Sequence, residues 1–290
     1  MKKLLFMCLL GVVSTLSFAQ LENIKINNDS TIIINELYAG MLSGSMFSTD
    51  SLSVDKIVDL RFGMCAEWKI VNTLSVKGMA MFSTDLSSDS WGLQQVEIDW
   101  MPNKKHLFQI GNMGTISTEQ RPGPVTGNGQ FETWTEAQIP GQALGMKYTF
   151  KPNNNWLIGT GVALRDNKPE YHGKIEVKAF TLSGYYRISE DNGGLAFTYK
   201  CDRIYNTFVW KNTEVFANIF SFKLVPKSNI NFYADLGYDL KKKDLVRCET
   251  GFLKKFSSKY AKGLWGVGYK YQPKALIPEK SVNVYLFIHL

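Results

Sequence analysis

Beyond its first 20 residues the sequence has no apolar run long enough to cross a bilayer as a helix, which takes about 20 consecutive apolar residues. A helical inner-membrane protein is therefore not expected. The sequence also lacks a dense basic stripe, because its longest basic run, Lys241–Lys243, is followed at once by Asp244. The formal net charge of +7 falls to +5 when Lys2 and Lys3 near the N-terminus are left out. A positive charge of this size without a basic stripe does not predict binding to nucleic acid.

Histidine and cysteine are scarce. The three histidines form no HxH or HExxH pattern, and His172, beside Glu170, is expected in a solvated outer loop. Cys65, Cys201 and Cys248 lie far apart without a CxxC pair, so neither a disulfide framework nor a zinc site is indicated. We therefore expect no catalytic residue, no metal and no cofactor, and the chain is not predicted to be an enzyme.

The first residues have the features of a secretory signal peptide. Lys2 and Lys3 are followed by a short apolar core over 4–13, and Ser17 and Ala19 place small residues before a cut ahead of Gln20. We expect residues 1–19 to be removed as a signal peptide and residues 20–290 to form one exported domain.

Clean alternation of apolar and polar residues recurs along the exported part. From Val58 to Ile70 every even position is apolar, while the odd positions include Asp59, Arg61 and Glu67. Further segments with this period of two lie at 95–100, 143–150, 195–200, 264–271 and 281–290. A helix would mix the two sets on every face, whereas a strand separates them. Strands of about ten residues are long for soluble sheets, but they suit a tilted bilayer crossing.

The connections also alternate in length. Short turns are expected near Asn72 and at 102–104, 152–154, 190–192, 226–228 and 257–259. The links between them are mostly longer, at 48–56, 84–90, 112–141, 166–173, 205–213 and 272–280, with a short turn at 241–243 as the exception. Outer-membrane barrels have short periplasmic turns and longer outer loops. The fold class predicted is all-β: a single transmembrane antiparallel β-barrel of about 14 strands, with 12 or 16 left open by the segment 200–225.

Aromatic residues near strand ends are typical of the girdles at membrane interfaces. The predicted girdle residues are Trp68, Trp91, Trp100, Tyr148, Trp156, Tyr185 and Tyr186. We expect the protein to lie in the cell outer membrane, in contact with membrane lipid and lipopolysaccharide. Assembly into a homo-oligomer is left open.

Four segments resemble the middle of the phosphate-selective porins O and P that are widespread in Bacteroidetes. They are Lys105–Asn112, Glu119–Pro124, Pro140–Tyr148 and Trp156–Val162, in which a strand enters a long loop and a hairpin follows. The resemblance covers about 60 residues. It implies a porin whose long loop, 112–141, folds into the lumen. The chain is shorter than that family and shows no arginine ladder or lysine cluster in its sequence.

The expected function is passive diffusion of small polar or ionic solutes through a water-filled lumen narrowed by the 112–141 loop. Charges on the polar face are the candidates for lining this pore: Arg61, Lys77, Glu97, Asp99, Lys147, Arg165, Lys200, Asp235, Arg247 and Lys270. The charged candidates at the constriction are Glu119, Arg121, Glu132 and Glu136.

Acids and bases are almost balanced on the polar face, which favours ion pairing across strands and weak selectivity. Two alternatives stay open. One is a closed structural or partner-binding barrel, because Tyr233, Tyr285 and Phe287 face the side of the charges and add bulk to the interior. The other is an exported β protein that is not inserted in a membrane.

Overall fold

The computed structural model describes residues 24–25, 31–48, 54–84, 89–114, 142–212, 214–224, 230–257, 262–273 and 279–289. These residues form one antiparallel sheet. Its strands are β1 Ile24–Lys25, β2 Thr31–Ser48, β3 Val54–Val71, β4 Leu74–Thr84, β5 Asp89–Asn103, β6 His106–Gly114, β7 Gln142–Asn153, β8 Trp156–Arg165, β9 Lys168–Val177, β10 Phe180–Arg187, β11 Asn192–Lys200, β12 Ile204–Lys211, β13 Val215–Lys223, β14 Ile230–Asp239, β15 Asp244–Ser257, β16 Lys262–Gln272 and β17 Glu279–His289. A single 3-10 turn, Ile188–Glu190, is the one helical element in the described part of the chain, where no helix is long and apolar enough to cross a membrane.

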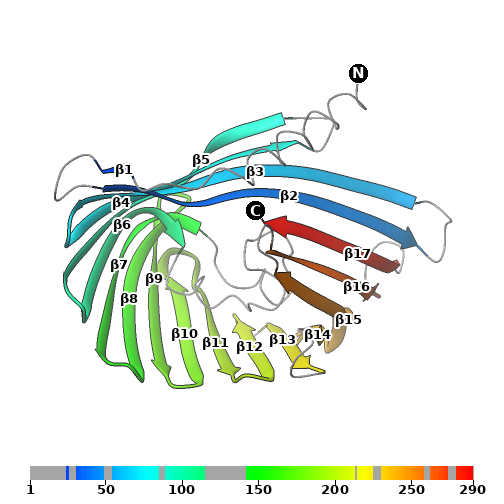
Figure 1. Cartoon of the computed structure of the whole chain (residues 1–290). Coiled ribbons are helices and arrows are strands. Elements are labelled where there is room, and N and C mark those ends of the chain that lie inside the picture. The colour runs from blue at the N-terminus through cyan, green and yellow to red at the C-terminus, as the bar shows by residue number, and fades with distance from the viewer. Residues whose placement is uncertain are drawn as a thin grey trace, which may run out of the picture.

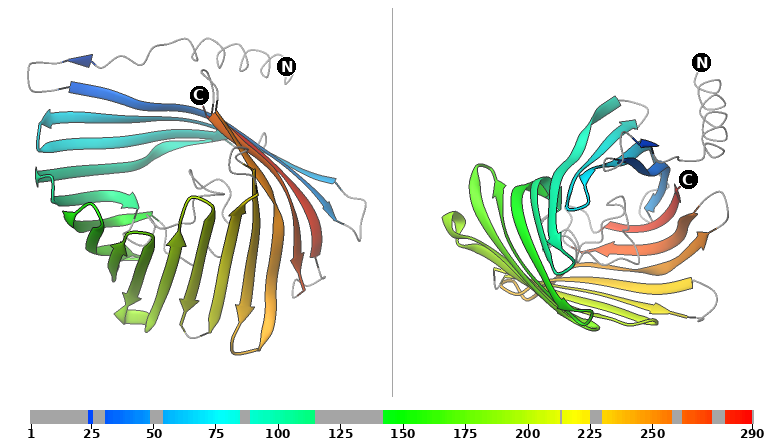
Figure 2. Two further views of the ribbon diagram at one scale, coloured as in Figure 1. Left: turned by 60° about the horizontal axis from the view of Figure 1, so that its bottom comes forward. Right: turned by 60° about the vertical axis from the view of Figure 1, so that its left-hand side comes forward.

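The strands from β2 to β17 form a ring. Each strand pairs with the next in sequence, including β9 with β10, and the last strand pairs with the first through Ser281 with Ser48 and Val282 with Phe47. The two-residue β1 is added to the start of β2. Figures 1 and 2 show the strands curving around one interior. The predicted all-β barrel is confirmed, with sixteen long strands, one of the alternatives, instead of fourteen.

The two additional strands come from the turns at 178–179 and 201–203, which the sequence analysis did not predict. The links predicted at 166–173 and 205–213 do contain turns, but both were predicted too long, because β9 already begins at Lys168 and β12 occupies most of the second range. Asp166 and Asn167, both with positive φ, make a two-residue hairpin turn. The next turn is held by Lys178 at a φ of 53° and contains no glycine or proline, so its composition gave no turn signal.

The two ends of the barrel differ in their connections. One end, called here the short-turn end, carries the turns at 72–73, 104–105, 154–155, 178–179 and 201–203. The opposite, long-loop end carries the turns at 166–167, 188–191 and 240–243 and the longest link, which joins β6 to β7 as expected. The turn predicted at 190–192 therefore lies at the opposite end from the one assigned to it, because the missed turn at 178–179 reverses the chain once more.

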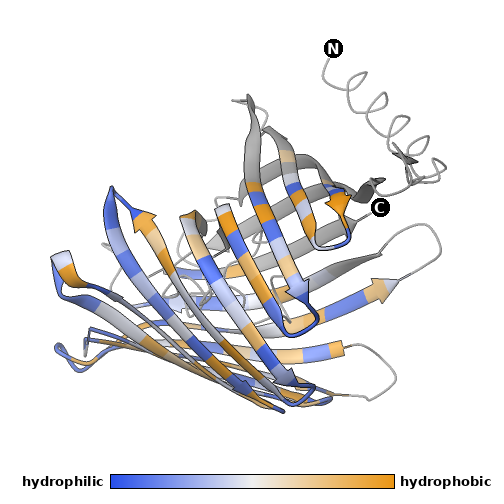
Figure 3. Cartoon of the chain, turned by 90° about the vertical axis from the view of Figure 1, so that its left-hand side faces the viewer, coloured by the Kyte–Doolittle hydropathy of each residue, from blue (hydrophilic) through white to orange (hydrophobic). Residues whose placement is uncertain are grey.

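The burial pattern is the inverse of that in a soluble protein. On β5, Val96, Ile98 and Trp100 are exposed while Glu97 and Asp99 are buried, and the same alternation recurs on β7, β9 and β10. Figure 3 shows apolar and polar residues alternating along the strands. In a closed barrel one face of each strand points outwards and the other inwards. The exposed apolar face and the buried polar face therefore identify a transmembrane barrel with a polar interior.

Aromatic side chains gather on the outer face near the strand ends. Trp68, Trp100, Trp156 and Phe180 are exposed close to the short-turn end, and Tyr171, Tyr186 and Trp210 are exposed close to the other. Of the predicted girdle residues, Tyr185 points inwards instead, where its ring lies 6.3 Å from that of His172. The side chain of Trp91 is outside the described residues.

Candidate functional site

The first group of charges on the inner wall joins β4, β5 and β6. The ammonium group of Lys77 pairs with Asp99 and lies 3.9 Å from Glu97 Oε1. Gln109 Nε2 donates to Asp99 Oδ1 at 2.8 Å. Because the two acids are buried and share one lysine, this part of the wall is an ion-pair network that crosses three strands. Three predicted pore residues, Lys77, Glu97 and Asp99, are thus brought together.

A second group is centred on Glu170, whose side chain is fully buried in β9. Arg187 Nη2 donates to Glu170 Oε2 at 2.9 Å, and His172 Nε2 lies 3.0 Å from Oε1. Arg165 Nε is 3.5 Å from the same Oε1. The group therefore places one carboxylate among three basic side chains from β8, β9 and β10.

This group corrects one prediction and extends another. His172 is not in a solvated loop: it is buried in the wall, because β9 begins earlier than the sequence suggested. Arg165 was predicted to line the interior, but Glu170 and Arg187 were not. A signal was present, since Glu170, His172, Lys174 and Glu176 follow a period of two. Pro169 obscured it, because proline is unusual inside strands, and here it stands next to the first residue of β9.

At the long-loop end this network reaches the turn after β10. Arg187 Nη1 donates to Glu190 Oε2 at 2.5 Å, and Lys168 Nζ lies 3.4 Å from Glu190 Oε1. The hydrogen bond from Arg187 holds the pKa of the exposed Glu190 carboxyl below its usual value.

A third group lies on β14, β15 and β16. Arg247 pairs with Glu249, and the Tyr233 hydroxyl donates to Glu249 Oε1 at 2.8 Å. The cross-strand neighbours of Glu249 are Asp235 on one side and Lys270 on the other. The predicted pore residues Asp235, Arg247 and Lys270 therefore meet around an acid from the same polar face. Tyr233 is buried on the charged side, as its position in the alternation indicated.

Three other predicted pore residues lie elsewhere. Lys147 is buried on the inner wall of β7, whereas Lys200 is exposed at the short-turn end. Of Arg61 the structure describes the backbone, opposite Gly40 in the pairing of β2 with β3. The constriction candidates Glu119, Arg121, Glu132 and Glu136 and the signal peptide 1–19 lie outside the described residues.

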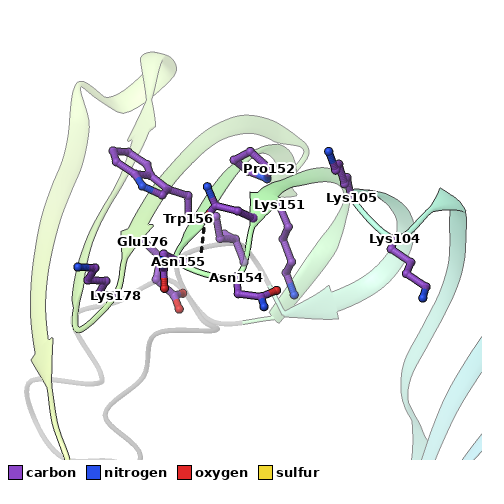
Figure 4. A pocket seen from close by; sticks show the side chains of 11 residues that line it. Lys104, Lys105, Lys151, Pro152, Asn154, Asn155, Trp156, Glu176 and Lys178 are labelled. Atoms are coloured by element: carbon purple, nitrogen blue, oxygen red, sulfur yellow. Dashed lines mark hydrogen bonds between the residues drawn. The ribbon is translucent and has the colours of Figure 1, made fainter.

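The short-turn end has two hollows lined by basic side chains. The larger, of about 490 Å³, has Lys104, Lys105, Lys151 and Lys178 around it, together with Glu176 (Figure 4). The smaller, of about 250 Å³, lies next to the turn 201–203, where its charged residues are Lys200, Asp202, Arg203, Lys223 and Lys255. We call these eight lysines and arginines the basic mouth. They are separated in sequence, and strand pairing brings them together.

Cys201 lies in the smaller hollow as an exposed free thiol. Hydrogen bonds from the backbone N–H groups of Arg203 and Ile204 lower the pKa of the Cys201 thiol. The turn around it is fixed, because the Cys201 N–H donates to the Ile204 carbonyl at 2.8 Å.

No family model and no curated protein matches the chain. Solved structures with the same fold include OmpF of Salmonella typhi in complex with daunomycin, with a TM-score of 0.63 and 10% identity over 92% of this chain and 99% of that one. A mutant porin of Rhodopseudomonas blastica aligns with a TM-score of 0.60 and 10% identity, covering 90% of this chain and all of the other.

A third structure is OmpT of Vibrio cholerae lacking loop L8, described as an outer-membrane protein. It has a TM-score of 0.59 and 10% identity over 91% of this chain and 100% of its own. These likenesses show the fold, which is that of porin-type outer-membrane barrels, and they agree with the predicted location. The predicted phosphate-selective type gains no support from them and stays a prediction. The chain therefore has a porin-like transmembrane barrel whose inner wall carries three groups of paired charges and whose short-turn end is basic.

Proposed function

We propose that the chain is an outer-membrane channel for the passive diffusion of small polar or ionic solutes. One observation supports this above all: in a ring of sixteen strands, charged and polar side chains face inwards on β4–β10 and β14–β16, while the described outer face is apolar. Barrels of 16–18 strands are wide enough to leave an aqueous channel, whereas those with about eight are filled by side chains. A polar wall in such a ring suits hydrated solutes, not apolar ones.

The three groups of paired charges suggest weak ionic selectivity. Lys77 shares two acids, Glu170 is in contact with three basic groups, and Arg247 is paired with Glu249. Opposite charges in contact leave little net field for the solute, so these walls favour neither cations nor anions strongly. The narrowing of the lumen by the loop 112–141, with Arg121 among its acids, is part of the proposal. So is a homo-oligomer, since OmpT of Vibrio cholerae is described in a trimer form.

Planar bilayers test the channel. Refolded protein should produce stepwise increases in conductance that scale with salt concentration, as a water-filled pore requires. Replacing residues 115–141 by a short glycine–serine linker should raise the unit conductance if the loop narrows the lumen. Silent bilayers, with circular dichroism showing a folded barrel, would refute the proposal.

A second candidate is a barrel whose interior is closed, with outer loops that bind a partner. The inner wall of β12–β15 favours it, because Val209, Ala217, Ile219 and Leu253 are apolar and fully buried there. Side chains that face a wide aqueous lumen would be exposed. Uptake of sugars by protein-containing vesicles separates the two candidates: swelling in isotonic sugar indicates an open lumen, and its absence together with silent bilayers indicates a closed one.

A further inference from the structure

Two asparagine side chains face outwards from β12 and β13, which are neighbours in the ring (Figure 1). Thr207 on β12 and the residues Ala217 and Ile219 on β13 are fully buried on the inner side of the wall. Successive side chains of a strand point to opposite sides. Asn206, which precedes Thr207, and Asn218, which lies between Ala217 and Ile219, therefore belong to the outer face that meets lipid.

Asn218 is surrounded by apolar side chains of the same outer face. Strand pairing places it between Phe208 of β12 and Leu236 of β14. Along β13 its outward neighbours are Phe216 and Phe220. Asn218 therefore lies within the apolar band of the barrel and not at its edge, so its amide is placed where lipid chains and not water surround the protein.

The two asparagines are hydrogen-bonded to each other and are only partly satisfied. Asn218 Nδ2 donates to Asn206 Oδ1 at 2.6 Å and to the Thr207 carbonyl at 3.0 Å. In the part of the chain that the structure describes, no group accepts the amide hydrogens of Asn206 or donates to Asn218 Oδ1. A side-chain amide has two hydrogens to donate and an oxygen that accepts. The pair therefore presents a donor and an acceptor side by side on the outer face.

A second copy of the same face supplies the missing partners. Lipid chains offer no hydrogen-bond partner, so leaving the two groups against lipid costs free energy. When two copies are related by a two-fold axis through the pair, Asn206 of each copy faces Asn218 of the other. Asn206 Nδ2 then donates to the other copy's Asn218 Oδ1 in both directions, which makes two equivalent hydrogen bonds. The donor and the acceptor are thus self-complementary, as a two-fold contact requires.

Aromatic rings around the pair form a packed apolar surface. The ring centroids of Phe208 lie 6.2 Å from Trp210 and 6.0 Å from Phe216, and those of Trp210 and Phe216 are 5.4 Å apart. On β14 and β15 the rings of Phe232 and Phe252 are 5.6 Å apart. Aromatic residues are enriched in protein interfaces, and rings that already pack against each other lose little freedom on association. The face therefore offers apolar area around a central polar pair.

We propose that the outer face of β12 and β13 is a dimer interface, in which two copies of this chain meet about a two-fold axis through Asn206 and Asn218. The proposal builds on the homo-oligomer in the proposed function, and it specifies the face and the symmetry of that contact. The contact lies on the lipid side of the wall, so it does not require that the barrel conduct.

Sedimentation equilibrium of the refolded protein in detergent micelles measures the mass and the dissociation constant of the dimer. Asn206→Leu should raise the dissociation constant roughly tenfold, because it removes both intermolecular hydrogen bonds. Asn218→Leu should have the same effect, and the double variant should add little, since each bond uses both residues. Thr160→Val is the matched control: it removes a polar group from the exposed outer face of β8 and should leave the dissociation constant unchanged.

Crosslinking in lipid vesicles locates the axis. In protein with the four native cysteines replaced by serine, Phe220→Cys places a single thiol beside the amide pair. A residue near a two-fold axis lies close to its own counterpart in the other copy, so a short thiol-specific crosslinker should join two chains. Met146→Cys, on the exposed outer face of β7, should give no crosslinked product.

Monomers in both assays, with circular dichroism showing a folded barrel, would overturn the proposal. So would a dimer that Asn206→Leu and Thr160→Val leave equally stable, or crosslinking that is equal at the two engineered thiols. A trimer without crosslinking at position 220 would place the contact on another face and would refute the two-fold interface. Silent bilayers from protein that passes both tests would refute the channel and leave the interface standing.

Discussion

Replacement of Glu170 by glutamine tests how much the buried charges of β8–β10 stabilise the barrel. The carboxylate is fully buried, accepts a hydrogen bond of 2.9 Å from Arg187, and lies 3.0 Å from the His172 ring nitrogen and 3.5 Å from Arg165. A glutamine keeps the shape but presents an NH₂ group to one of these donors and removes the negative charge. Arg187 then keeps its hydrogen bond to Glu190 at the surface but loses the buried carboxylate that it contacts in the wall.

Removing one partner of a buried ion pair costs about 3–5 kcal/mol, and we expect Glu170→Gln to fall in that range. The matched control is Glu176→Gln on the same strand, whose side chain is 42% exposed and 3.6 Å from Lys174. Because the Glu176 carboxylate is solvated, although the Lys174 side chain is only 6% exposed, the control should cost clearly less than Glu170→Gln.

Guanidinium unfolding of the barrel in lipid vesicles, followed by tryptophan fluorescence, measures both variants. In a double-mutant cycle, Glu170→Gln and Arg187→Gln should show a coupling of about 1–3 kcal/mol. If Glu170→Gln were no more destabilising than Glu176→Gln, the cluster would not stabilise the fold and its burial would need another explanation.

Four other predictions follow from the two faces, the turns and the loop. Arg121→Glu should shift the reversal potential in a salt gradient towards cations at low salt and much less at 1 M, where the Debye length is about 3 Å; an unchanged potential at low salt would place Arg121 outside the solute pathway. Met146→Arg on the lipid-facing side of β7 should destabilise the barrel in vesicles by about 2–4 kcal/mol, as measured by guanidinium unfolding with Met146→Leu as the control. Gly268→Ala should destabilise the fold, because its Cβ would lie 2.3 Å from the Tyr233 hydroxyl; Tyr233→Phe in the same protein should restore part of the loss. The pKa of Glu190 is lowered, so its pairing with Arg187 stabilises the fold fully at pH values above the ordinary glutamate pKa. This stabilisation is lost as the pH falls through the lowered pKa. Glu190→Gln and the wild type should therefore differ in unfolding free energy at neutral pH and converge in acid.

The sequence by itself determined the class of fold and the direction of each side chain within the clear strands. Alternation assigns residues to faces without knowledge of their neighbours, because successive side chains of a strand point to opposite sides. Val96 and Ile98 were thus separated correctly from Glu97 and Asp99, and Tyr233 was placed on the charged side. The longest link was also placed correctly, after the fifth long strand.

Only the tertiary structure decided the number of strands and the partners of each charge. Lys178, at a φ of 53°, lies in the turn between the paired strands β9 and β10, and this turn has no glycine or proline, so composition did not reveal it. Which charges meet depends on strand register, which sets Glu170 near Arg187 across β9 and β10. The basic mouth likewise exists only because adjacent hairpin turns gather at one end of the ring, which brings lysines from Lys104 to Lys255 together.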